Sequence, residues 1–456
     1  MSEYLRRCWA ASKVYRVALV IAVVYVVLRL AVHGAYLAMM LYPDAGIMGG
    51  VPEWAGAENE PMVPDDLRIY LDAATRLHLK QDLYLSGTVD RMEFYQYPPF
   101  YALTFVPFLW LPRAVVAIVY TILHIVIYGL LYIRWGYIFR QLDLDKASEM
   151  LAWTLPVWLV FAAFWGDLGY LNVYIFTALL STWLIDAVLN ESLGRSFLWL
   201  SIILQIKPQW AFAIALPLFF GRYRFFVKLL ALTIVIYVAI AGTTMLIVGP
   251  DYGWSQYVDY FQLLRNIQSG DYPWRGPEMP FLGYNHSIKQ TVVYLLGVAP
   301  SVLHLTTGIK VLLLLPLVGV FIRYIFQPIG RPGYTLPTLA LDFVFALYLG
   351  AFIWLDVVWE LSLGIAVFTY LLATSERRWC QVLVWCVFLP YALLDVIQVA
   401  SFAVLGMDVI VPGPYVLTDP SIYVPLVMIV ILTFYGLLLK RLWDARPMRR
   451  VMKVSA

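Results

Sequence analysis

Charged residues are scarce in this sequence. Asp, Glu, Lys and Arg make up 13% of the 456 residues, about half the share of a typical soluble domain. Apolar residues make up 62%, and the mean hydropathy is +0.77. This composition excludes a soluble globular fold. Apolar runs long enough to cross a bilayer recur from residue 14 to residue 440, so we predict a single all-α integral membrane domain over residues 1–456.

Several chemical motifs are also missing. The three cysteines lie in or beside apolar segments or near the N-terminus, which argues against a disulfide framework. The five histidines are scattered without metal-ligand spacing. There is neither a glycine-rich phosphate-binding loop nor an H-E-x-x-H motif, which disfavours an ATPase or a zinc protease. We therefore expect no metal, no cofactor and no nucleic-acid partner.

The distribution of basic residues predicts the orientation in the membrane. Basic residues precede the first apolar run, which lacks a clear cleavage site and is therefore expected to stay as a signal anchor. Lys and Arg favour the cytoplasmic side, which places both termini in the cytoplasm of a protein of the cytoplasmic (plasma) membrane. This orientation requires ten crossings, near residues 17–41, 114–134, 150–166, 169–189, 227–249, 308–327, 336–354, 356–374, 380–405 and 421–440.

Two further apolar stretches do not fit as crossings. Residues 97–112 are short and contain four prolines, which predicts a re-entrant or interfacial element. Residues 196–220 are interrupted by Lys207-Pro208, where we expect a hairpin to turn. Irregular backbone at membrane depth is tolerated only where it is buried in protein or lines a cavity, so Lys207 marks a predicted polar cavity. The alternative is that Lys207 extends to a lipid headgroup.

Two predicted outer loops are large. The first, residues 43–96, holds ten acidic residues against four basic ones and has helical patterning from Asp66 to Leu79. Loops beyond about 15 residues are usually functional or disordered. We therefore predict that this loop carries an active-site segment on the extracytoplasmic face. The second loop, residues 250–290, is dense in aromatic residues, which also anchor proteins at membrane interfaces.

Carboxylates in these regions are candidates for chemistry. Asp65 and Asp66 begin the helical segment, where a carboxylate is also an ordinary capping or first-turn residue. A carboxylate at this face could act as a general base on an acceptor hydroxyl. Asp356 and Glu360 are four residues apart in a predicted crossing, so we expect them to share one helix face near the outer boundary.

Basic residues mark a second candidate region. His286 and Lys289 flank Ser287, where the second outer loop re-enters the membrane. They could hold a lipid phosphate, or they could simply end a solvated loop.

Short motifs occur in a definite order along the chain. They are Asp66-Leu67-Arg68-Ile69-Tyr70, Asp82-Leu83-Tyr84, Tyr97-Pro98-Pro99-Phe100, Asn172, Ile206-Lys207-Pro208-Gln209 and Asn285-His286-Ser287. Together they resemble glycosyltransferase family 87, over roughly residues 60–360. Two positions depart from the family pattern, because Trp359-Glu360-Leu361 lacks the histidine of a W-x-H-like motif and Asn172 lacks a preceding Gln-Val.

The resemblance implies a C-type glycosyltransferase with about ten transmembrane helices and its active site at the large first outer loop. It also implies a polyprenyl-phosphate sugar as donor, most often mannose, and a hydroxyl of a membrane glycolipid or glycan as acceptor. Asp66 then matches the general base of an inverting displacement. The predicted substrate-binding residues are Tyr70, Tyr84, Tyr97, Asn172, Lys207, Arg275, Asn285, His286, Lys289 and Glu360.

A transporter or a flippase for lipid-linked sugars is the alternative. Ionisable residues inside the membrane and broken helices are also typical of transport pathways. Transporters usually consist of two repeated halves, and the long acidic loop after the first apolar run has no counterpart later in the chain. A third possibility is an enzyme of the same architecture that uses lipid-linked oligosaccharide or arabinose.

Overall fold

All regular secondary structure in the described part of the chain is helical. The computed structural model describes residues 2–42, 62–84, 95–269, 274, 277, 285–326, 337–405 and 420–445. The predicted all-α class is therefore confirmed for these residues.

Five of the described helices are long and apolar enough to cross a membrane. They are α2 (Lys13–Leu41), α5 (Arg113–Gln141), α12 (Tyr223–Val248), α15 (Pro300–Phe326) and α20 (Pro420–Asp444). Two bent sets of helices raise the number to seven if each forms one crossing. These are α6 (Asp145–Trp153) with α7 (Leu155–Leu159) and α8 (Ala162–Tyr170), and α18 (Arg378–Ala392) with α19 (Leu394–Leu405). The protein is thus a multi-pass membrane protein.

Most of the remaining helices are shorter. They are α1 (Ser2–Ala11), α3 (Asp65–His78), α4 (Pro99–Phe105), η5 (Val106–Trp110), α9 (Tyr174–Leu189), α10 (Leu193–Leu204), η6 (Pro208–Ala215), α11 (Leu216–Phe219), α13 (Pro250–Ser269), α14 (Ile288–Leu296), α16 (Pro337–Trp354) and α17 (Gly364–Thr374). α17 has 11 residues. At about 1.5 Å per residue it covers roughly half of a hydrocarbon layer about 30 Å thick. The number of ten crossings stays a prediction.

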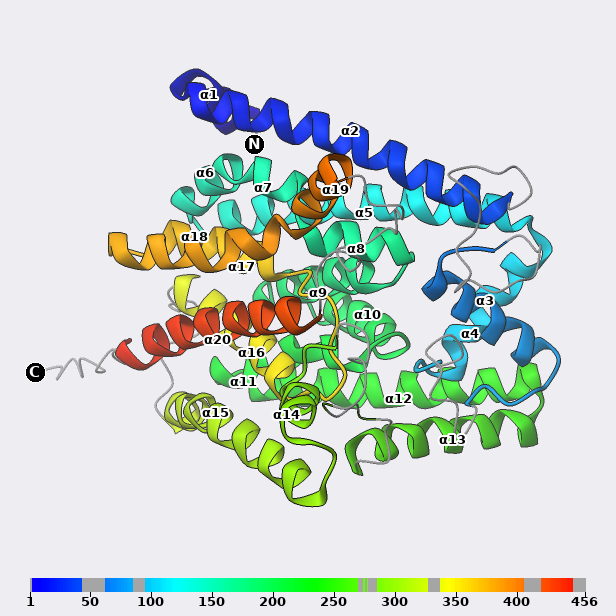
Figure 1. Cartoon of the computed structure of the whole chain (residues 1–456). Coiled ribbons are helices and arrows are strands. Elements are labelled where there is room, and N and C mark those ends of the chain that lie inside the picture. The colour runs from blue at the N-terminus through cyan, green and yellow to red at the C-terminus, as the bar shows by residue number, and fades with distance from the viewer. Residues whose placement is uncertain are drawn as a thin grey trace, which may run out of the picture.

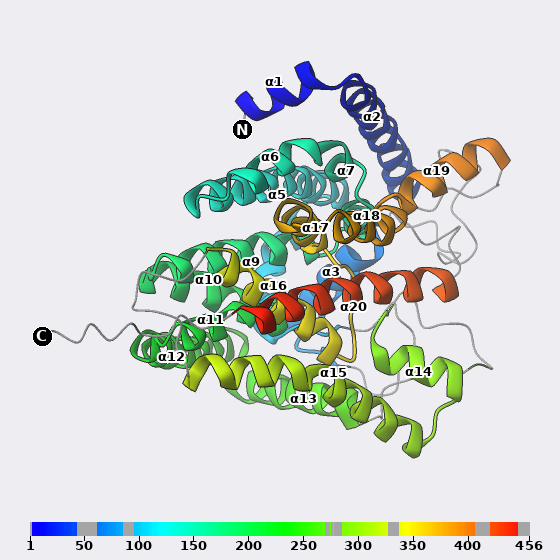
Figure 2. The same cartoon turned by 90° about the vertical axis from the view of Figure 1, so that its left-hand side faces the viewer.

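The helices differ in what surrounds them. α16, α17 and α20 lie between α2 above and α15 below in both views, whereas α2 lies along the upper edge (Figures 1 and 2). Every residue of α17 from Gly364 to Leu372 is buried. By contrast, Val14 on α2 and Leu246 on α12 are 78% and 76% exposed. Long apolar helices with outward-facing apolar side chains are suited to contact with lipid.

α3 and α4 lie at one end of the molecule, opposite to α1 (Figure 1). α3 confirms the helix that the sequence pattern predicts from Asp66 to Leu79. The proline-rich stretch that follows forms only the short α4 and η5, and both pack against α3. The region 97–112 is therefore short and broken, as its prolines predict.

Two helix breaks have a local cause in the sequence. α8 ends at Leu171, whose φ of 53° lies in the left-handed region that terminates helices. α10 ends before Lys207-Pro208, because the proline ring cannot continue the preceding helix. The second break confirms the predicted interruption of residues 196–220.

A third break corrects a prediction. Residues 355–363 form an irregular segment between α16 and α17. The prediction that Asp356 and Glu360 share one helix face is therefore wrong. The physical reason is tertiary packing. Side chains from elsewhere in the chain form hydrogen bonds with the backbone of this segment and prevent it from forming a helix.

Candidate functional site

α3 places Asp66 beside a buried group of tyrosines. Asp66 is half-buried in the first turn, where the helix dipole favours a carboxylate. Tyr70 lies one turn later on the same side of the helix and is fully buried. The charge of Asp66 acts on the hydroxyls of Tyr70, Tyr97 and Tyr174. The predicted base thus faces the protein interior from the end of the molecule where α3 lies.

Asn172 connects this group to the first helix break. Its side-chain oxygen accepts hydrogen bonds from the Tyr70 hydroxyl at 3.0 Å and from the Tyr97 hydroxyl at 3.5 Å. The two hydroxyls are also 3.0 Å apart, and the backbone N–H of Val173 donates to the same Asn172 oxygen at 2.7 Å. One amide oxygen therefore joins α3, the segment before α4 and the start of α9.

Tyr84, another predicted residue, supports the backbone at Tyr97. The Tyr84 hydroxyl donates to the carbonyl oxygen of Tyr97 at 2.6 Å. Burial raises the pKa of the Tyr70, Tyr84 and Tyr97 hydroxyls well above its ordinary value. All three therefore stay protonated at neutral pH and act as hydrogen-bond donors rather than as bases.

His124 and Asp167 hold the break around Asn172, and no sequence motif marks either residue. The ring nitrogens of His124 lie 2.6 Å from the carbonyl oxygen of Asn172 and 2.8 Å from that of Tyr120. The Asp167 carboxylate accepts from the backbone N–H groups of Tyr174 and Ile175 and so caps α9. Buried polar residues in apolar helices are a signal for such sites.

Lys207 lies at the second break and points toward the same tyrosines. Its ammonium is 3.5 Å from the ring centroid of Tyr174 and 5.4 Å from that of Tyr97, so it is placed for cation–π contact. The carboxylates of Asp66, Asp167 and Glu360 all attract it electrostatically. This position among carboxylates and rings does not fit an ammonium that extends to a lipid headgroup.

Glu360 lies on the irregular segment at the third break and is buried. Asn285 shapes that segment, because its side-chain oxygen accepts from the N–H of Val358 at 3.0 Å and its amide donates to the carbonyl of Asp356 at 3.0 Å. The backbone N–H of His286 donates to the Val358 carbonyl at 3.1 Å. The predicted residues Asn285, His286 and Glu360 are therefore parts of one connected region.

Lys289 belongs to a largely buried charge cluster with Asp356 and Lys310, of which the sequence pattern marks only Lys289 and Asp356. Its ammonium lies 3.3 Å from one Asp356 oxygen, and the Lys310 ammonium bonds to the other. Lys310 also donates to the carbonyl of Trp354 at 2.8 Å. Two lysines thus share one carboxylate at the end of α16. A lysine within the apolar run of α15 is itself a signal that could have found Lys310.

Arg275, the remaining predicted residue, lies outside the described residues. Among the residues that the structure does describe, no group of three or more His, Cys, Asp or Glu side chains is placed to hold a metal ion.

The arrangement combines a carboxylate with cations. Asp66 can accept a proton from a hydroxyl, and Lys207 and the Lys289–Asp356–Lys310 cluster offer positive charge to an anion. The buried tyrosines and Asn172 hold α3 against the helix breaks. These features define a multi-pass membrane protein with a polar site built at interruptions of apolar helices.

The chain belongs to glycosyltransferase family 87, whose family model matches residues 95–373, more than half of its length. No curated protein and no solved structure matches the chain. The matched residues include the helix breaks with Asn172, Lys207 and Glu360 but not Asp66, Tyr70 or Tyr84. The protein is thus a glycosyltransferase of the membrane, and membership of this family favours the enzyme over the transporter.

Proposed function

We propose that the protein transfers a sugar, mannose in the first instance, from a polyprenyl-phosphate donor to a hydroxyl of a lipid or glycan acceptor on the extracytoplasmic face. The observation that supports this proposal is that Asp66 and Lys207 approach the same pair of tyrosines. Tyr70 lies one turn after Asp66 on α3, and its hydroxyl is 3.0 Å from that of Tyr97. The Lys207 ammonium lies 5.4 Å from the centroid of the Tyr97 ring. A base and a cation at one site suit the displacement of a phosphate. A cation at a break between apolar helices can reach the phosphate of a donor that lies in the lipid phase.

The proposed reaction is an inverting displacement. The acceptor oxygen forms a bond to C1 of the sugar while Asp66 takes the hydroxyl proton. The bond between C1 and the phosphate oxygen breaks, and its electron pair stays on the polyprenyl phosphate. Lys207, with Lys289 or His286, stabilises the negative charge of that leaving group. The positive side chains of the site supply this stabilisation without requiring a metal.

The remaining assignments follow from this scheme. We propose a C-type architecture with about ten crossings, cytoplasmic termini and the active site under residues 43–96. α3 and α1 lie at opposite ends of the molecule (Figure 1), which supports placing the active site and the N-terminus on opposite sides of the membrane. A role in making cell-envelope glycolipids suits such an enzyme.

The test is transfer of radiolabelled mannose from synthetic polyprenyl-phosphate mannose to extracted membrane lipids, with purified full-length protein and EDTA. We expect chelator-resistant transfer by the wild type, and a loss of about 100-fold or more in Asp66→Asn. Asp65→Asn is the matched control, because the Asp65 carboxylate lies 3.3 Å from the Arg68 guanidinium on the same helix.

Each other outcome has a definite meaning. Full activity of Asp66→Asn would remove Asp66 from the role of base, and loss of activity only in Asp65→Asn would assign that role to its neighbour. Transfer from another polyprenyl-phosphate sugar but not from the mannose donor would correct the sugar alone. Movement of the donor between leaflets without covalent transfer would favour a flippase.

A further inference from the structure

A cavity lies on the reverse side of α3 from the catalytic candidate. It has a volume of about 270 Å³ and lies between α3, η5 and the first turn of α5. From α3 it is lined by Arg68, Leu71, Asp72 and Thr75. Residues two positions apart on a helix do not face the same way, so Arg68 and Asp66 point to different sides. The cavity is therefore separate from the site described above.

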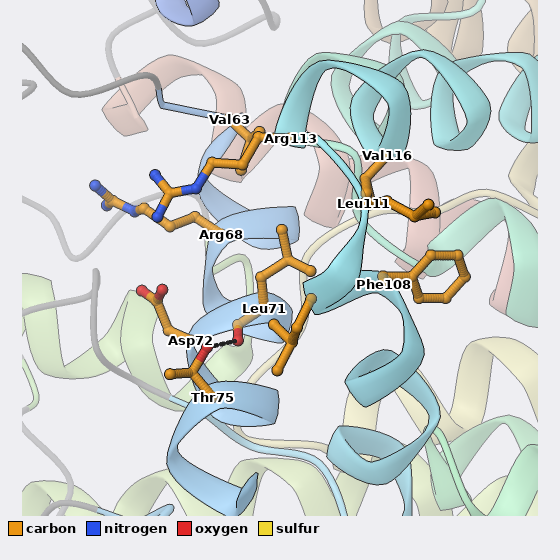
Figure 3. A pocket seen from close by; sticks show the side chains of 10 residues that line it. Val63, Arg68, Leu71, Asp72, Thr75, Phe108, Leu111, Arg113 and Val116 are labelled. Atoms are coloured by element: carbon orange, nitrogen blue, oxygen red, sulfur yellow. Dashed lines mark hydrogen bonds between the residues drawn. The ribbon is translucent and has the colours of Figure 1, made fainter. Parts of the chain in front are cut away.

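Two arginines give one side of this cavity its chemistry. Figure 3 shows the side chains of Arg68 and Arg113 extending toward the same side, near the carboxylate of Asp72. Arg68 also lies 3.3 Å from a carboxylate oxygen of Asp65. A guanidinium has five N–H donors, so a carboxylate neighbour orients it and still leaves donors for a phosphate. Arg113 is in addition the first residue of a 29-residue helix, whose dipole favours an anion there.

The opposite side of the cavity is apolar. It is formed by Leu71, Phe108, Leu111 and Val116 (Figure 3), and Leu109 and Val63 also line the cavity. The ligand must therefore have both a negatively charged group and an apolar part. Free phosphate meets only the first requirement.

The position along α5 identifies the source of such a ligand. α5 is one of the five helices that can cross a membrane, and Arg113 is at its first turn. Trp110, three residues earlier, is 74% exposed, which is typical of a side chain at the membrane interface. On the face of α5 turned away from Arg113, the exposed apolar side chains of Val115, Ile118 and Ile122 indicate that the hydrocarbon region begins within the first turns of this helix. A headgroup at the arginines would thus leave its acyl chains in the lipid.

We infer that this cavity binds an anionic phospholipid of the surrounding membrane. The phosphate is bound by Arg68 and Arg113, and the glycerol and upper acyl chain lie against η5 and the start of α5. The lipid supports α3 from the side opposite to Asp66. Lipid binding at this cavity does not require sugar transfer, so it can be tested independently of the proposed function.

The test is native mass spectrometry of the purified, delipidated full-length protein titrated with phosphatidylglycerol or with phosphatidylcholine of the same acyl chains. We expect one saturable phosphatidylglycerol site and about tenfold weaker binding of phosphatidylcholine. The Arg68→Gln/Arg113→Gln double variant should bind phosphatidylglycerol about tenfold or more weakly. Leu109→Trp should weaken it too, because the indole fills the cavity while both arginines remain.

Two controls make the assignment specific. Arg76→Gln changes an arginine of the same helix that does not line the cavity, and Asp66→Asn changes the other side of α3; both should keep wild-type binding. Equal binding of the two lipids by the wild type would overturn the inference, and that comparison needs no variant. Unchanged binding in Leu109→Trp and in the double variant would also overturn it. Displacement of the lipid by inorganic phosphate at equal concentration would assign the site to a free phosphate.

Discussion

The hydroxyl of Tyr70 donates a hydrogen bond to the side-chain oxygen of Asn172 at 3.0 Å, across 102 residues of sequence. The bond joins α3, which carries Asp66, to the break between α8 and α9. The orientation of the proposed base therefore depends on a residue inside the apolar part of the protein.

Tyr70→Phe should lower the free energy of unfolding by about 1 kcal/mol or more, because it removes the buried hydroxyl that contacts both Asn172 and Tyr97 and leaves the ring in place. The melting temperature in detergent measures this effect. Tyr137→Phe is a matched control, since the Tyr137 side chain is 46% exposed. If the Tyr70–Asn172 bond orients α3, Asn172→Ala should reduce transfer at least as much as Tyr70→Phe. Unchanged melting and transfer in both variants would contradict the role given to this bond.

Lys207→Met should reduce transfer by about tenfold or more and shift its pH dependence. The variant removes the cation that Asp66, Asp167 and Glu360 attract. A carboxylate that loses a neighbouring cation is protonated more readily. As the pH is lowered, the base of the variant is therefore protonated, and inactive, at a higher pH than that of the wild type. The acid limb of the pH–rate profile should therefore move to higher pH. Lys228→Met, at an exposed lysine on α12, should leave the profile in place; a shift of equal size there would point to a general charge effect.

Asp356→Asn should destabilise the protein by up to about 3 kcal/mol, because it leaves Lys289 and Lys310 as neighbouring positive charges without their shared carboxylate. The double variant Asp356→Asn/Lys289→Gln removes one of the two charges and should recover part of that loss. Thermal unfolding of the four proteins of this cycle measures the coupling. Additive losses in the double variant would show that the three side chains do not act as a unit.

Arg29→Met should destabilise the protein by about 3 kcal/mol or more. Arg29 and Asp395 form a buried ion pair with 2.9 Å between Nε and a carboxylate oxygen, and this pair connects α2 to α19. Removal of one partner leaves a buried charge, whereas replacement of both by apolar residues is often close to neutral. The double variant Arg29→Met/Asp395→Leu should therefore melt closer to the wild type than the single variant. Melting of the double variant below that of Arg29→Met would contradict this account.

The sequence predicted much of the membrane fold because hydropathy and helical period depend on neighbouring residues. The apolar runs of α2, α5, α12, α15 and α20 are long enough to be recognised without any tertiary information. Two sequence patterns near α3 also depend only on neighbouring residues. The amphipathic pattern predicted α3, and the prolines predicted the short elements that follow it.

The sequence predicted many of the residues of the site, but not which residues they contact. Lys207 stood out because a lysine before a proline in an apolar run is costly unless it lines a polar region. Glu360 was assigned to the wrong local structure, since Asn285 binds the backbone at Val358 and Asp356 from 73 and 71 residues away. His124 and Lys310 carried no recognised motif, and only their partners in space show what they hold.

The sequence by itself determined that this is a multi-pass helical membrane protein with polar interruptions, because each of those properties arises from a short stretch of residues. Only the tertiary structure decided that Asn172 and Lys207, on separate helix breaks, contact the tyrosines beside α3, and that a third break buries Glu360 where it acts on the Lys207 ammonium. Their meeting depends on how apolar helices pack against one another. A buried polar group must then find its partner wherever that packing places one.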